Sequence, residues 1–173
     1  VLDHSAQSAD LVDRAICSET ATLSFQQGAD GYWGTQDTEI RERYKNSSYG
    51  SRTSISVDYN SSTRDQQGLI RFGDIFGSGA GVLPTDQPIV KAELVLYATK
   101  GTYHDISIYQ MLADWSENST WNTMNDGVST DGYEALASAD DTLYDPGSGD
   151  YYAFDVTASL TNWQRDPATN KGW

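Results

Sequence analysis

The chain has 173 residues, 38% of them hydrophobic and 12% aromatic, which fits one domain with a single core. Asp and Glu number 25 against 11 Lys and Arg, and the resulting net charge of −14 argues against a nucleic-acid partner and against an anionic membrane surface. The lone Cys17 excludes a disulfide within the chain, and no apolar run is long enough for insertion into a membrane.

Residues 1–20 differ in pattern from the rest of the chain. Ser8 can cap a short helix that carries Leu11, Ala15 and Ile16 along one side, but the same segment also fits an arm that becomes ordered against a partner. We therefore treat residues 1–20 as an N-terminal extension or assembly arm and residues 21–173 as the domain.

The charged stretch at residues 37–50 is best interpreted as an edge strand followed by a bend. We expect Ile40 to point inward and Glu39, Arg41 and Arg43 to alternate outward, because successive side chains of a strand face opposite sides.

Alternation of polar and apolar residues predicts several further strands. In residues 89–101, Leu94 and Leu96 point one way while Val95 and Tyr97 point the other. Similar patterns occur at 21–27, 53–59, 68–76, 104–112 and from residue 151 onward. Long polar loops rich in Gly separate these segments, so we predict an all-β fold, specifically an antiparallel jelly-roll β-sandwich.

One helix is predicted near the end of the chain. Residues 157–166 follow a strand, with Thr157 as the expected cap and with Leu160 and Trp163 facing inward.

No catalytic constellation is recognisable, so we predict that the protein is not an enzyme. His4 and His104 lie near no Ser or Cys nucleophile motif. Acidic residues are so abundant that no pair stands out, and none lies in an apolar segment that would raise its pKa.

Acidic turns make a structural calcium ion a reasonable expectation. Residues 30–37 and 139–150 supply the hard oxygen ligands that calcium prefers, although neither segment has the spacing of an EF-hand loop.

Aromatic and basic residues suggest a surface that binds sugars, and the arginines would suit acidic sugars. The alternative is that most of these aromatic side chains pack in the core or in turns. The candidate ligand-binding residues are Tyr32, Trp33, Arg41, Arg43, Tyr49, Arg71 and Tyr103. Candidate glycosylation sites, compatible with an extracellular location, are Asn46, Asn60 and Asn118.

A family resemblance rests on four motifs that follow one another along the chain. Asp-Thr-x-Ile at 37–40 leads to a turn with Asn46, Tyr49 and Gly50, and the segments 69–101, 115–122 and 155–163 follow. This order resembles the DNRLRE-domain family, a group of carbohydrate-binding modules related to disaggregatase, over residues 21–173.

The resemblance implies a non-catalytic jelly-roll domain of the kind appended to secreted polysaccharide-degrading enzymes or surface proteins. Some members bind acidic polysaccharides such as alginate. Asp37 would lie on an early strand and Asp155 on a late one, and we take these two as a candidate metal pair for Ca²⁺ because buried acids need a cation or donors.

The family usually continues beyond the turn that here reads Asn170 to Trp173, so we expect a C-terminal strand to be missing. Either a neighbouring copy supplies that strand, with residues 1–20 as the donor, or the chain is a fragment. Two functions therefore stand side by side. The first is an extracellular polysaccharide-binding module, and the alternative is a structural subunit of an extracellular filament or surface layer assembled from copies of itself.

Overall fold

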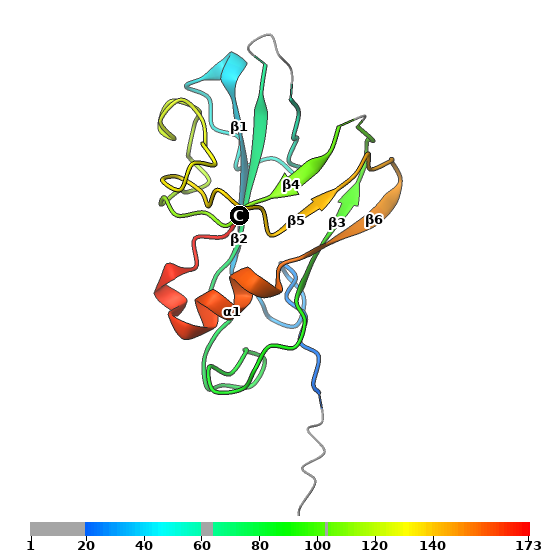
Figure 1. Cartoon of the computed structure of the whole chain (residues 1–173), viewed down its shortest axis with the longest axis vertical. Coiled ribbons are helices and arrows are strands. Elements are labelled where there is room, and N and C mark those ends of the chain that lie inside the picture. Colours follow the sequence, from blue (N-terminus) through cyan, green and yellow to red (C-terminus); the bar gives the residue numbers. More distant parts are fainter. Residues whose placement is uncertain (1–19, 60–63, 103) are drawn as a thin grey trace, which may run out of the picture.

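The computed structural model describes residues 20–59, 64–102 and 104–173 (Figure 1). Within them the chain forms three two-stranded antiparallel sheets and one α-helix. The expected all-β class is confirmed, whereas the jelly-roll connectivity stays a prediction. The N-terminal extension, apart from residue 20, lies outside the described residues, as do Asn60 and Tyr103.

The first sheet joins β1 (Thr35–Arg41) to β2 (Gln66–Phe72), in a register that runs from Thr35 opposite Phe72 to Arg41 opposite Gln66. A 3₁₀ turn, η1 (Glu42–Tyr44), follows β1.

Four strands on the other side of the molecule form the remaining sheets. β3 (Glu93–Ala98) pairs with β6 (Asp150–Asp155), and β4 (Ile106–Ile108) pairs with β5 (Asp141–Leu143). β5 also contacts the end of β6, where the Asp155 N–H donates to Asp141 Oδ2 at 2.8 Å. α1 (Thr157–Arg165) and the 3₁₀ turn η2 (Pro167–Thr169) complete the chain.

The apolar interior consists of two clusters instead of the expected single core. The cluster between β3, β6 and α1 contains Leu94, Phe154, Leu160, Trp163 and Trp173. The second cluster lies against β1 and β2 and contains Ile40, Leu69, Met111, Trp115, Trp121, Met124 and Ala135. The inward orientation predicted for Leu160 and Trp163 is confirmed.

Three local predictions were wrong. Residues 21–27 form no strand, and residues 53–59 contribute only an isolated bridge between Asp58 and Gln66. Thr157 does not cap α1, because it lies within the first turn and its Oγ1 accepts a hydrogen bond from the Ala92 N–H at 2.9 Å. The sequence pattern of each segment was compatible with the prediction, and at Thr157 a contact with the distant Ala92 replaced the expected cap.

The C-terminal segment runs along the outer edge of β2. Ile70 and Trp173 exchange two backbone hydrogen bonds of 2.8 Å, and the Met111 N–H donates to the Gly172 carbonyl. A cleft of about 310 Å³ opens beside Trp173, between β2 and β4. The missing C-terminal strand stays a prediction.

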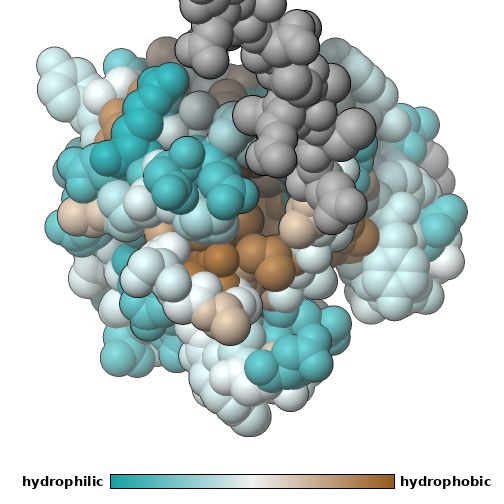
Figure 2. Space-filling view, turned by 90° about the horizontal axis from the view of Figure 1, so that it is seen from below, coloured by the Kyte–Doolittle hydropathy of each residue, from teal (hydrophilic) through white to brown (hydrophobic). Residues whose placement is uncertain are grey.

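The surface agrees with the acidic composition. Figure 2, a view from below, shows mostly hydrophilic residues around a small apolar area. In the described part of the chain, no helix combines the length and the apolar character needed to cross a membrane.

Candidate functional site

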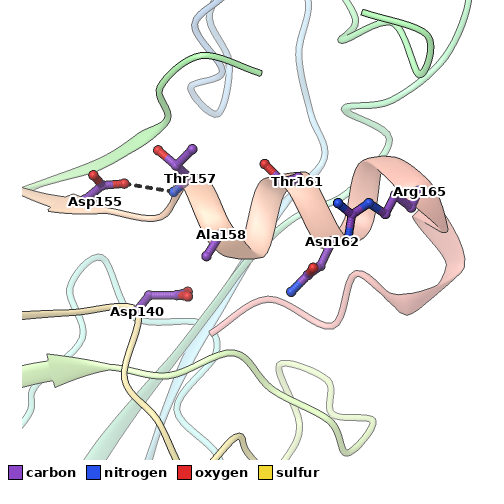
Figure 3. Close-up of a pocket in the computed structure, with 7 residues that line it drawn as sticks. All are labelled: Asp140, Asp155, Thr157, Ala158, Thr161, Asn162 and Arg165. Carbon is purple, nitrogen blue, oxygen red and sulfur yellow. Dashed lines mark hydrogen bonds between the residues drawn. The ribbon is translucent and has the colours of Figure 1, made fainter. Parts of the chain in front are cut away.

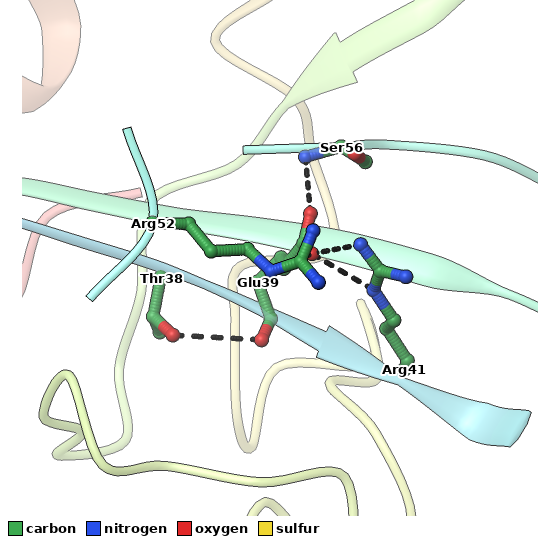
Figure 4. A network of polar contacts seen from close by, with 5 residues as sticks. All are labelled: Thr38, Glu39, Arg41, Arg52 and Ser56. Carbon is green, nitrogen blue, oxygen red and sulfur yellow. Dashed lines mark hydrogen bonds and ion pairs between the residues drawn. The ribbon is translucent and has the colours of Figure 1, made fainter. Parts of the chain in front are cut away.

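A buried carboxylate organises one end of the β1–β2 sheet (Figure 4). The prediction that Glu39 points to solvent was wrong, because its exposed fraction is 0%. Residues 52–56 cover the side chain, and its carboxylate accepts hydrogen bonds from the Arg41 guanidinium and from the Ser56 N–H. Arg52 Nε lies 3.8 Å from the same carboxylate.

Tyr49 belongs to this network. The guanidinium carbons of Arg41 and Arg52 lie 4.5 and 4.9 Å from the centre of its ring. Arg41 and Arg52 therefore contact both the Tyr49 ring and the Glu39 carboxylate, so these groups satisfy one another within the chain. A ligand-binding role for Arg41 and Tyr49 stays a prediction.

Tyr32 and Arg71 also have partners inside the chain. The Tyr32 hydroxyl donates to the Gly73 carbonyl at 2.8 Å, and burial raises the pKa of Tyr32 to about 12. Arg71 donates to the side-chain oxygen of Gln36 and lies 5.4 Å from the ring of Trp115.

The remaining sugar-site candidates divide into exposed residues and one that the structure does not describe. Trp33 is 72% exposed, and Arg43 on η1 is also exposed. Tyr103 lies outside the described residues. Of the glycosylation candidates, Asn46 and Asn118 are exposed and Asn60 lies outside the described residues. The proposed roles of all these residues stay predictions.

The two acids of the candidate metal pair belong to different sheets. Asp37 on β1 is half-buried, and burial, followed by the nearby charge of Glu117, raises its pKa, so the expectation that no acid has a raised pKa was wrong. Asp155 at the end of β6 is exposed, and hydrogen bonding to Thr157 lowers its pKa. Among the described residues, no three His, Cys, Asp or Glu side chains cluster closely enough to hold a metal. The bound Ca²⁺ stays a prediction.

One pair of aromatic rings is exposed to solvent, unlike the arginine and tyrosine side chains that have partners within the chain. Tyr97 and Tyr151 are 52% and 70% exposed, and their ring centroids lie 5.0 Å apart at an interplanar angle of 58°. Among the ring pairs of the described residues, this is the one in which both rings are exposed. The contact follows from the register, because Tyr97 on β3 lies directly opposite Tyr151 on β6.

These tyrosines are part of a continuous outward sheet face. Because side chains alternate along a strand, the same face carries the cross-strand pairs Val95 with Ala153 and Glu93 with Asp155. All six residues are exposed, whereas Leu94 and Phe154 on the opposite face are buried. We call these six residues, Glu93, Val95, Tyr97, Tyr151, Ala153 and Asp155, the tyrosine platform.

A polar hollow of about 490 Å³ begins where the tyrosine platform ends (Figure 3). Asp155 belongs to both, since it ends β6 and leads into α1. The other lining residues are Asp140, which lies beside the first turn of the helix, and Thr157, Ala158, Thr161, Asn162 and Arg165 of α1. The spacing of these α1 residues places them on one stripe of the helix, opposite the buried Leu160 and Trp163.

Sequence reasoning did not select Tyr97 and Tyr151 as site residues. The alternation in residues 89–101 correctly placed Tyr97 on the outward face of its strand. This was the one feature of the sequence that could have pointed to Tyr97 as a site residue. The pairing of Tyr97 with Tyr151 depends on which strands become neighbours, which the sequence pattern of either strand does not show.

An all-β domain that presents a pair of exposed aromatic rings on an open sheet face has a feature of a ligand-binding module. Comparison with known families narrows this class: the model of carbohydrate-binding module family 96 matches residues 31–171, and the chain therefore belongs to that family. The expected carbohydrate-binding class is confirmed, while the DNRLRE name stays a prediction. No curated protein matches the chain.

Proposed function

We propose that the protein is a non-catalytic, extracellular module that binds a polysaccharide across the tyrosine platform. The observation that carries the proposal is the contact between two exposed rings, Tyr97 and Tyr151, on an open sheet face. Membership of a carbohydrate-binding module family supports the ligand class.

The chemistry of the platform suits a sugar ring. An aromatic ring offers a large apolar face with little conformational freedom to lose on binding, and the two tyrosine hydroxyls add polar groups. Both rings stand on paired strands whose other face is buried in the core, so their spacing is set before the ligand arrives.

A preference for acidic glycans, which the arginines in the sequence suggested, would have a structural basis other than the tyrosine platform. Among the basic residues around η1 it would depend on Arg43 and Lys45, because Arg41 and Arg52 are engaged within the chain, as is Arg71 on β2. Lys45 itself pairs with Asp126 at 2.9 Å. Binding through these residues is the alternative within the same function.

The filament alternative rests on residues 1–20, of which the structure describes only residue 20. None of the contacts among the described residues favours it. Deletion of residues 1–20 tests it, since loss of self-association on deletion would support a subunit of an assembly.

A glycan array of neutral and acidic polysaccharides tests the proposal. The variant Tyr97→Ala/Tyr151→Ala should bind its best ligand about tenfold more weakly than the wild type, equivalent to about 1.4 kcal/mol. Tyr133→Ala/Tyr144→Ala is a matched control, because it removes two exposed tyrosines that have no ring contact with each other or with the platform pair. Unchanged binding by the platform variant, or an equal loss in the control, would contradict the proposed site.

A further inference from the structure

We propose that the cleft between β2 and β4 is a docking site for a short extended peptide of another protein, one that carries apolar side chains and a net positive charge. The cleft is lined by Leu94, Leu96 and Phe154 on the inner face of the β3–β6 sheet. The tyrosine platform lies on the outer face of the same sheet, so this inference does not depend on the proposed function.

The outer edge of β2 has an open position between two occupied ones. At Gln66 the backbone exchanges hydrogen bonds of 2.9 and 3.0 Å with Asp58, and at Ile70 it exchanges two of 2.8 Å with Trp173. Alternate residues of a strand direct their backbone groups toward the same edge, so Gly68 directs its N–H and carbonyl there as well. None of the backbone hydrogen bonds among the described residues occupies this edge at Gly68.

The open part of this edge has room for a short extended segment. β2 advances roughly 13 Å from Gln66 to Ile70, at about 3.3 Å a residue. Because Asp58 and Trp173 occupy the two ends of that length, about three residues of another chain fit between them, with the middle one opposite Gly68. Such pairing adds a strand segment to the edge of a sheet, which is a common way of binding extended peptides.

The cleft beside this edge offers the apolar surface that a short segment needs. One backbone pair alone contributes little net free energy in water, because it replaces hydrogen bonds to solvent. The side chains of the docked peptide add to this by burying apolar area against the cleft. The apolar lining includes the buried Leu69, Leu94 and Met111 and the half-buried Ile70, Leu96 and Ile106.

The charge of the cleft selects a basic partner. Its lining contains Asp58, Asp65 and Asp105 and, in the part of the chain that the structure describes, no Lys or Arg. Asp58 and Asp105 are exposed, so their charges face an incoming ligand and attract a cationic peptide. The same charges disfavour residues 1–19 of a second copy, because that segment carries four acids and one arginine.

Titration calorimetry of the full chain with synthetic peptides tests the docking site. The probe is the peptide Lys-Val-Lys-Val-Lys, blocked at both ends. Its matched analogues carry glutamate in place of lysine, or an N-methyl group on the central residue that prevents backbone pairing. The cleft variant, Asp58→Asn/Asp105→Asn, removes two exposed acids from the lining, and the control variant, Asp86→Asn/Asp145→Asn, removes two exposed acids elsewhere.

We expect the lysine–valine peptide to bind the wild type and to protect the Gly68 amide from hydrogen exchange. The glutamate analogue and the N-methylated analogue should each bind about tenfold more weakly, the first through repulsion by the acids and the second through loss of the backbone pair. The cleft variant should lose about fivefold in affinity for the lysine–valine peptide, because exposed charges are partly screened. The control variant should match the wild type.

Other outcomes contradict specific parts of the proposal. If the lysine–valine peptide does not bind the folded wild type, or binds no better than its N-methylated analogue, the added strand is overturned. An equal loss in the control variant overturns the cleft as the site, because the acidic surface as a whole then attracts the peptide. Tighter binding of a peptide with the sequence of residues 1–19 overturns the partner class in favour of a second copy.

The platform variant separates this proposal from the proposed function. Tyr97→Ala/Tyr151→Ala changes the outer face of the sheet and leaves the lining of the cleft intact, so it should bind the lysine–valine peptide as tightly as the wild type. A loss of peptide binding in this variant, with the fold intact by circular dichroism, overturns the cleft as the site, whereas failure of glycan binding alone counts only against the proposed function.

Discussion

Glu39 connects two segments of the chain, β1 and residues 52–56, through one buried carboxylate. Burying a charge without partners is costly, so this side chain must be compensated by donors. Arg41 comes from the same strand, whereas Arg52 and the Ser56 N–H come from the segment that covers the strand. The network therefore fixes residues 52–56 over β1 and has a structural role.

Replacing the carboxylate should test this role directly. We expect Glu39→Gln to lower the free energy of unfolding by about 2–3 kcal/mol, because the charge-assisted hydrogen bonds weaken and the arginines lose their counter-charge. Urea denaturation measures the loss. Since the network lies away from the tyrosine platform, the folded variant should keep wild-type glycan affinity, and a loss of affinity without a loss of stability would contradict a structural role.

Tyr32 makes stability sensitive to alkaline pH. An unfolded tyrosine loses its proton near pH 10, whereas the folded Tyr32 keeps it until about pH 12. Between these values the folded state binds the additional proton, so this residue's contribution to stability falls as the pH rises through that window.

The variant Tyr32→Phe separates this contribution from those of the other tyrosines. At pH 8 it should be less stable than the wild type by about 1 kcal/mol, because the hydrogen bond to Gly73 is lost. At pH 11 the difference should shrink, since phenylalanine has no proton to lose. Urea titrations at the two pH values measure both differences, and a difference that stays constant would contradict the assigned pKa shift.

At the scale of elements, the C-terminal segment depends on one backbone conformation. Gly172 has φ of +72°, and a methyl group at this position would contact the Ile70 carbonyl and lie 2.8 Å from Arg71 Cα. Only glycine allows the chain to approach β2 this closely and still place Trp173 in the core.

We expect Gly172→Ala to destabilise the fold by about 2–4 kcal/mol, from the left-handed backbone and the clash together. Gly81→Ala is a suitable control, because Gly81 has a similar φ of +79° but open space around it, and it should cost about 1 kcal/mol. Thermal unfolding compares the two. Equal losses would show that the contact with β2 does not matter.

The elements differ in how far their sequences determine them. β3 and α1 could be predicted because their patterns match the burial that they adopt, with Leu94 inward on β3 and Trp163 inward on α1. The segment 53–59 has an equally regular pattern, yet it crosses over Gly68 with Ile55 and Val57 instead of pairing as a strand. Periodicity indicates which side chains are buried, but whether a backbone pairs depends on a free neighbouring edge.

The candidate site was less predictable than the fold, because it depends on which strands become neighbours. Arginine and tyrosine side chains close together in sequence suggested a sugar-binding surface, but Arg41 pairs with the buried Glu39 and lies over the ring of Tyr49. Tyr97 and Tyr151 are separated by 53 intervening residues in the sequence, and only the β3–β6 register brings them together.

At the scale of the whole molecule, the two apolar clusters lie behind different surfaces. The cluster that contains Leu94, Phe154 and Trp163 lies between the β3–β6 sheet and α1, so it supports the tyrosine platform from behind. The β1–β2 sheet and its network stabilise the other part of the domain. On this account one part of the molecule displays the tyrosine platform and the other stabilises the fold.

Chemical-shift mapping by NMR, with a polysaccharide fragment selected on the glycan array, tests the central claim most directly. We predict that the backbone amides that shift on titration cluster at Glu93, Val95, Tyr97, Tyr151, Ala153 and Asp155. Shifts concentrated instead at residues 41–52, with the platform amides unmoved, would contradict the account.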